Sequence, residues 1–122
     1  GAFMDKMLKQ ALLYDFYGEL LTAHQKSIYE DFVLNDFSLS EIGEDRNISR
    51  QGVYDIVKRC EKLLNGYEEK LHLVQKFLTA KEQVEKIHEL AGEILRTEGV
   101  PETSTEYLRQ IENISNGILE EM

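Results

Sequence analysis

The sequence predicts an all-α protein, with a helix-turn-helix domain at residues 4–66 and a helical arm at residues 67–122. Apolar residues recur three or four positions apart through most of the chain, which is the period of an amphipathic helix. Capping signatures separate these segments, and the chain contains a single proline. We expect the arm to be a long helix followed by a C-terminal helix, and we assign it to dimerisation.

Two helices are predicted ahead of the motif. The first covers residues 5–17, where one face is apolar and consists of Met7, Leu8, Ala11, Leu12 and Phe16. The second covers residues 22–34. Thr22 and Gln25 have the spacing of a capping box, in which the hydroxyl and the amide each satisfy a free backbone N–H.

The next stretch, SLSEIGEDRNISRQGVYDIVKR from Ser38 to Arg59, predicts a helix, a tight turn and a second helix. Ser38 and Glu41 repeat the capping box and begin a short helix that ends near Arg46. Asn47 tolerates the left-handed conformation of a turn, and Ser49 can cap the following helix. We expect Gly43 to lie where the two helices cross, because a residue without Cβ permits close approach.

The outward face of the second motif helix is the candidate nucleic-acid-binding surface. Arg50 can pair with guanine and Gln51 with adenine, while Tyr54 and Lys58 can contact phosphates. The helix begins at Ser49, and a helix N-terminus favours anions. The candidate contact residues are Ser49, Arg50, Gln51, Tyr54 and Lys58. On spacing alone, a solvated face of an ordinary helix explains them equally well.

In the arm, a stripe of apolar residues along one helix face indicates a helix of about 30 residues. Its members are Leu64, Tyr67, Leu71, Val74, Leu78, Val84, Ile87, Ala91 and Ile94. Thr79 and Glu82 could cap a new start, so the helix is expected to run unbroken or to kink near residues 79–81. Gly99 and Pro101 then end it, and a last helix follows. Such a stripe needs a partner helix, so we expect a homodimer; a closed hairpin within one monomer is the alternative.

Composition excludes several other classes of protein. Cys60 is the only cysteine, which suits a reducing compartment, and we expect a cytoplasmic protein with no membrane-spanning segment. His24, His72 and His88 lack neighbours at zinc-ligand spacing, and no glycine-rich phosphate loop occurs. We therefore expect no catalytic residues, no metal, no cofactor and no small-molecule substrate, and the protein is not predicted to be an enzyme.

The formal net charge of −9 opposes DNA binding, which depends on lysine and arginine. The charge is uneven, however, since residues 38–62 carry five acids and five bases, whereas residues 63–122 carry twelve acids and six bases. Two hypotheses follow. In the first, the neutral motif of a regulatory protein binds DNA; in the second, a module that does not bind DNA uses its acidic helical surface to bind a cationic partner.

The segments DFYGELLTAHQKSIY, DFSLSEIGE and SRQGVYDIVKR, followed by YEEKL, resemble the YlxM-type helix-turn-helix proteins of Gram-positive bacteria. That family is similar to region 4 of bacterial sigma factors, so the resemblance implies DNA contacts by Arg50, Gln51, Tyr54 and Lys58. YlxM-type genes lie beside the gene of the signal recognition particle GTPase, which implies a regulatory role in protein targeting and particle components as partners. The chain departs from the family pattern at Arg46, where an apolar residue is usual, and at Gly52 in the second motif helix.

Overall fold

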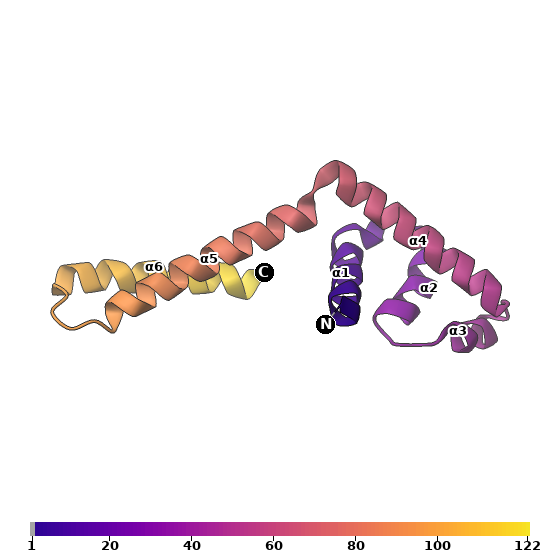
Figure 1. Cartoon of the computed structure of the whole chain (residues 1–122), viewed down its shortest axis with the longest axis horizontal. Helices are drawn as coiled ribbons and strands as arrows, with labels where there is room; N and C mark the ends of the chain where they lie inside the picture. Colours follow the sequence, from indigo (N-terminus) through magenta and orange to yellow (C-terminus); the bar gives the residue numbers. More distant parts are fainter. Residues whose placement is uncertain (1) are drawn as a thin grey trace. The chain divides into compact units, whose positions relative to one another are not determined.

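The computed structural model describes residues 2–122, with side chains from residue 6 onward, and every regular element in this range is helical. The elements are α1 (Ala2–Tyr17), the 3-10 turn η1 (Gly18–Leu20), α2 (Ala23–Val33), α3 (Leu39–Arg46), α4 (Arg50–Leu71), α5 (Leu73–Leu95) and α6 (Glu102–Glu121) (Figure 1). The predicted all-α class is confirmed. None of the described helices is long and apolar enough to span a membrane.

Both predicted capping boxes form. The Thr22 hydroxyl accepts a hydrogen bond from the Gln25 N–H at 3.2 Å, and the Gln25 side-chain oxygen accepts one from the Thr22 N–H at 3.0 Å. Ser38 and Glu41 make the same reciprocal pair at 3.0 and 3.1 Å. The bond from the Ser38 N–H lowers the pKa of the Glu41 carboxyl. These contacts are local in sequence, which is why α2 and α3 begin where the sequence predicts.

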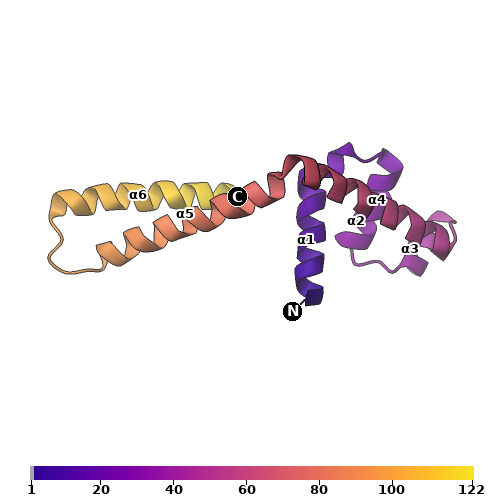
Figure 2. The same cartoon turned by 45° about the horizontal axis from the view of Figure 1, so that its top comes forward.

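Helix α4 supports the first part of the fold, because α1, α2 and α3 all pack against it (Figures 1 and 2). The inner face of α4 is at most 2% exposed and consists of Val53, Val57, Cys60 and Leu64. The largest fully buried side chains that the other helices contribute are Tyr17, Ile28, Tyr29 and Ile42. Burial of one face along about three turns fixes which face of α4 remains in solvent.

The chain forms two compact units, of which the first ends at Val74 and the second comprises Gln75–Met122. This junction lies beyond residue 66, the end of the helix-turn-helix domain expected from the sequence. The rings of Tyr67 and Tyr17 have centroids 6.0 Å apart, and Val74 is buried in the first core. The first core therefore uses the whole of α4.

The prediction of an unbroken helix through residues 64–94 is wrong, because the chain breaks at His72. His72 adopts a left-handed conformation with φ 55° and ends α4. The Tyr17 hydroxyl then accepts from the Leu73 N–H at 3.2 Å, and the Glu68 carboxylate accepts from the Val74 N–H at 3.0 Å. Tyr17 also donates its hydroxyl proton to Glu68 at 2.6 Å. A residue of α1 thus helps to cap α5, and the spacing of apolar residues cannot reveal such a contact.

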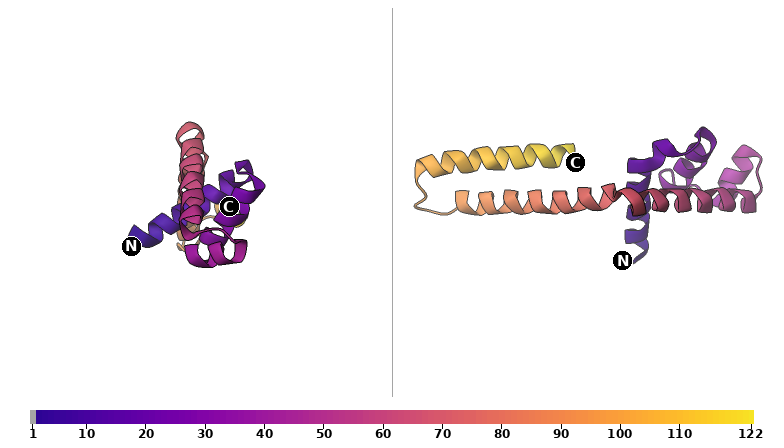
Figure 3. Two further views of the ribbon diagram at one scale, coloured as in Figure 1. Left: turned by 90° about the vertical axis from the view of Figure 1, so that its right-hand side faces the viewer. Right: turned by 90° about the horizontal axis from the view of Figure 1, so that it is seen from above.

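The kink considered near residues 79–81 is absent, since α5 continues through Thr79 and Lys81. Residues 96–101 turn the chain, with Gly99 at φ 81°, and Pro101 precedes α6. Helix α6 runs antiparallel to α5 and lies beside it, as Figures 1 and 2 and the right panel of Figure 3 show. The predicted last helix is confirmed, and it folds back on α5 of the same chain.

The first testable prediction concerns Gly43, where an added Cβ would lie 2.5 Å from the Ile48 carbonyl oxygen. Because a backbone atom cannot move aside cheaply, Gly43→Ala should lower the free energy of unfolding by roughly 1–3 kcal/mol. Gly66→Ala is the matched control, because no atom lies within 4 Å of a Cβ added there. It should stabilise α4 by about 0.5–1 kcal/mol through the lower conformational entropy of the unfolded chain. Urea denaturation of the two variants measures both values, and equal effects would contradict the close approach.

Candidate nucleic-acid interface

The turn between α3 and α4 satisfies a free backbone group at each of the two helix ends. Asn47 adopts the left-handed conformation at φ 56°, as predicted, and its N–H donates to the Gly43 carbonyl. The Ile48 N–H donates to the same carbonyl at 2.8 Å. The Ser49 hydroxyl accepts from the Gly52 N–H at 3.0 Å and begins α4. The helix-turn-helix geometry therefore rests on bonds within ten residues.

Glycine allows the turn to lie close to both helices. The close approach predicted at Gly43 is confirmed, although its nearest neighbour is the backbone of Ile48 in the turn and not the second helix. A Cβ at Gly52 would lie 2.9 Å from Ile48 Cγ2 and 3.1 Å from Ser49 Oγ. The departure at Gly52 thus has a physical reason, because the missing side chain leaves room for the residues of the turn.

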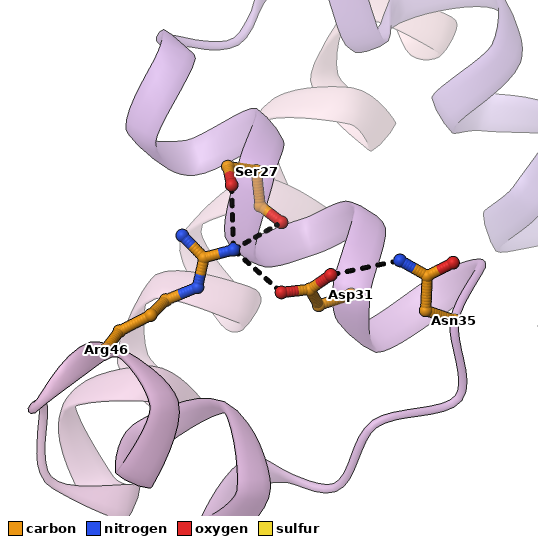
Figure 4. A network of polar contacts seen from close by, with 4 residues as sticks. All are labelled: Ser27, Asp31, Asn35 and Arg46. Atoms are coloured by element: carbon orange, nitrogen blue, oxygen red, sulfur yellow. Dashed lines mark hydrogen bonds and ion pairs between the residues drawn. The ribbon is translucent and has the colours of Figure 1, made fainter.

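Arg46, the other departure, fastens α3 to α2 (Figure 4). Its Nη2 donates to Asp31 Oδ2 at 2.7 Å and to Ser27 Oγ at 2.8 Å. Asn35 Nδ2 donates to the other oxygen of Asp31 at 3.0 Å. The side chains of Arg46 and Asp31 are 25% and 16% exposed, so solvent screens this ion pair less than a surface pair. Arg46 therefore orients the first motif helix.

All five predicted contact residues are exposed, at the start of α4 and along its outer face. Four of them already have intramolecular contacts: Ser49 caps α4, Gln51 Nε2 donates to Asp55 Oδ1 at 3.0 Å, and Lys58 Nζ lies 5.6 Å from the centroid of the Tyr54 ring. The side chain of Arg50 makes no hydrogen bond or ion pair with the described residues. Of the five residues, Arg50 therefore has the fewest existing side-chain contacts to break when it binds a ligand.

A basic groove, which the motif pattern did not predict, lies further along α4. A depression of about 400 Å³ is lined by Arg59, Lys62, Leu63, Gly66, Tyr67 and Lys70. Three cations and no carboxylate line it, although the whole chain is acidic. The spacing of Arg59, Lys62, Gly66 and Lys70 by three, four and four positions is the signal that could have identified it, because such residues share a helix face.

Two acidic residues of α4, Glu61 and Glu68, form hydrogen bonds with side chains of α1. Glu61 accepts from Gln10 of α1 at 2.8 Å and from Lys58 at 3.4 Å. Glu68 accepts from Tyr17 and from the Val74 N–H, as described above. Counting charges along the chain cannot detect this, since the hydrogen-bond donors come from distant segments.

A mainly apolar groove of about 370 Å³ lies beside Tyr54 and Lys58. Helix α1 contributes Met7 to its lining and α2 contributes Phe32, while Phe37 comes from the segment before α3. Tyr54 lines this groove and is 41% exposed, so the residue contacts both the groove and solvent.

The residues considered for catalysis or metal binding lie apart. Cys60 is fully buried, and burial raises the pKa of its thiol to about 11, so the thiol remains protonated near neutral pH. His24 lies on α2, His72 between α4 and α5, and His88 on α5, where its Nδ1 is 3.1 Å from Ser115 Oγ. Within the described part of the chain, no group of three His, Cys, Asp or Glu side chains is placed to hold a metal ion.

Comparison with known protein families gives a match over most of the chain. The sequence profile of UPF0122, described as "Putative helix-turn-helix protein, YlxM / p13 like", matches residues 4–98. The chain belongs to this family. The match includes α2, α3, α4 and α5, and so it confirms the resemblance drawn from the motif residues.

Individual UPF0122 proteins are similar over most of their length. The YlxM protein of Bacillus subtilis is 49% identical over 89 residues, which cover 73% of this chain and 81% of that protein. A protein of Thermoanaerobacter sp. (strain X514) is 47% identical over 116 residues, covering 95% and 96% of the two chains. One of Caldanaerobacter subterraneus subsp. tengcongensis is 55% identical over 85 residues, covering 70% and 73%.

The second prediction concerns Asp31, whose pKa is lowered mainly by the hydrogen bond from Arg46 and then by that from Asn35. A carboxyl with a lowered folded pKa contributes stability that is complete above its unfolded pKa of about 3.9 and is lost as pH falls through the folded value. Asp31→Asn should therefore cost roughly 1–2 kcal/mol at pH 7 and less at low pH. Denaturation at several pH values measures the difference.

Asp15→Asn is the control for this series, because it removes an exposed carboxylate of α1 that does not contact Arg46. Its pH profile should follow the wild type. A constant stability difference between Asp31→Asn and wild type across the acid range would refute the assigned role of the Asp31 charge.

Proposed function

We propose that this protein is a DNA-binding regulatory protein of the cytoplasm, which contacts the duplex with the outer face of α4. The main support is that the helix-turn-helix is completely formed and that its candidate contact residues are exposed. These are Ser49, Arg50, Gln51, Tyr54 and Lys58. A helix of this kind enters the major groove with its N-terminal residues at the base edges. Arg50 and Gln51 occupy those first positions of α4.

Contacts to phosphates extend this surface along the helix. Lys58 and Tyr54 lie next to the reading residues, and Arg59 and Lys62 follow in the basic groove. Phosphate contacts supply most of the non-specific affinity and position the protein on the duplex, whereas base contacts specify the sequence. Two of the groove's cations, Arg59 and Lys62, are already counted in the zero net charge of residues 38–62, and Lys70 adds a third possible phosphate contact.

The third prediction is a salt-dependent affinity for a short mixed-sequence DNA duplex. Affinity should fall steeply as salt rises, since bound cations release counterions from DNA. Arg50→Ala should weaken binding several-fold, and Lys62→Ala should reduce the slope of log affinity against log salt by about 1. Fluorescence anisotropy over a salt series measures both quantities.

Arg109→Ala provides the matched control, because it removes one exposed positive charge from α6 in the second unit. It should change neither the affinity nor the slope. A wild-type protein that does not bind the duplex even at low salt would reject the proposed function.

A second candidate function is binding to a cationic component of the signal recognition particle. It is favoured by the charge of residues 75–122, which carry ten acids and five bases. Glu82, Glu85, Glu89 and Glu93 are all exposed on α5. An acidic surface of this kind attracts basic partners and raises their rate of association.

The fourth prediction tests this candidate by charge reversal. The double variant Glu82→Lys and Glu89→Lys should abolish capture of the particle's basic protein component in a pulldown at moderate salt. Asp15→Lys with Glu44→Lys reverses two exposed charges in the first unit and should leave capture intact. Equal loss in both double variants, or no capture by the wild type, would argue against this partner.

A further inference from the structure

The second unit has almost no core of its own. Among residues 75–122 the buried positions are Ala91, Gly92 and Ser115, which have small side chains. The Nδ1 of His88 lies 3.1 Å from Ser115 Oγ across the hairpin, so even the seam between α5 and α6 is partly polar. Two helices that bury so little apolar surface do not offset the conformational entropy lost on folding. Another surface must therefore cover this hairpin.

A row of large apolar side chains remains in solvent on both helices of the hairpin. On α5 these are Ile87, Leu90 and Ile94, and on α6 they are Tyr107, Ile111, Ile114 and Ile118. Each is 43–65% exposed. Their spacing by three and four positions is that of one helix face, and on α6 it follows a heptad pattern over three steps.

The seven exposed residues lie on the same side of the hairpin. Each of them directly precedes a buried or half-buried residue, as Ile87 precedes His88, Leu90 precedes Ala91 and Ile114 precedes Ser115. The contact between His88 and Ser115 shows that this less exposed side of each helix forms the seam. Successive residues of a helix are about 100° apart, so the exposed stripe of each helix is rotated by about 100° in the same sense from the seam. Because α5 and α6 are antiparallel (Figure 3), rotation in the same sense brings both stripes to one side.

The hairpin therefore presents a flat apolar face two helices wide, with an angle between seam and face that suits the square arrangement of a four-helix bundle. At about half of each side chain exposed, the seven residues offer on the order of 600 Å² per copy, close to the roughly 800 Å² that each partner contributes to a standard interface. The residues of the face are all uncharged. A charged partner has nothing to pair with there, whereas an identical face is complementary.

We infer that this face binds the same face of a second copy, so that two α5–α6 hairpins form an antiparallel four-helix bundle and the protein is a homodimer. A two-fold axis makes the same residues meet from both sides, which suits two matching apolar stripes. The inference stands apart from DNA binding, since it concerns the hairpin alone. Where DNA is bound, two linked motifs would raise the affinity through effective concentration.

The fifth prediction compares two neighbouring substitutions in α6. Ile114→Glu places a charge on the face, while Asn113→Glu places the same charge about 100° away, on the exposed side that faces neither stripe. Sedimentation equilibrium of the full chain should give twice the 14.2 kDa of one chain for the wild type and for Asn113→Glu. Ile114→Glu should weaken the dimer at least 10-fold. The thermal midpoint of the wild type should also rise with protein concentration, because only the folded state associates.

Ile111→Ala is a milder variant in case Ile114→Glu does not fold, with helical content checked by circular dichroism. It should retain helix and weaken the dimer several-fold. A wild-type monomer at all accessible concentrations would overturn the inference. The inference would also be overturned if Ile114→Glu were less stable than the wild type but had the same mass in sedimentation equilibrium, because the face would then be covered within one chain. Equal dissociation by Ile114→Glu and Asn113→Glu would overturn it as well.

Discussion

Burial of the inner face of α4 is the constraint on which the first unit depends. The face is closed by side chains from α1, α2 and α3, and its members from Val53 to Leu64 are at most 2% exposed. Burying that stripe fixes the rotation of α4 about its own axis, because the apolar face must lie against α1, α2 and α3. The outer face, with Arg50 at its start, is exposed for this reason, and the candidate interface is a consequence of the core.

Polar contacts between helices fix helix orientations and helix ends that burial alone does not determine. Arg46 ties α3 to α2 through Asp31, and Tyr17 with Glu68 ends α4 and begins α5. Burial and the bond to Glu68 raise the pKa of the Tyr17 hydroxyl, which therefore remains a proton donor at neutral pH. Charge-assisted bonds in partly buried positions are stronger than surface pairs, so they can set the orientation of a helix.

The two units pose different physical problems. The first has a closed core and an exposed polar surface, and its fold is that of a family defined by the helix-turn-helix. Fold alone does not establish function, so the case for DNA depends on side chains of α4 and on where its carboxylates are held. The second unit leaves its large apolar residues in solvent, and a hairpin of this kind is incomplete without another surface.

Features that depend on neighbours within a few positions could be predicted from the order of the residues. They are the capping boxes at Thr22 and Ser38, the left-handed turn at Asn47 and the outward face of α4. Local hydrogen bonds and helical periodicity suffice for these. The break at His72, the ion pair of Arg46 with Asp31 and the hydrogen bond between Gln10 and Glu61 became visible only in three dimensions. Each of these depends on a hydrogen-bonding group from a helix distant in the sequence. Tyr17 of α1, for example, accepts from the Leu73 N–H at the start of α5, and Gln10 of α1 donates to Glu61. Periodicity along one chain carries no record of such partners, because packing between helices brings them together.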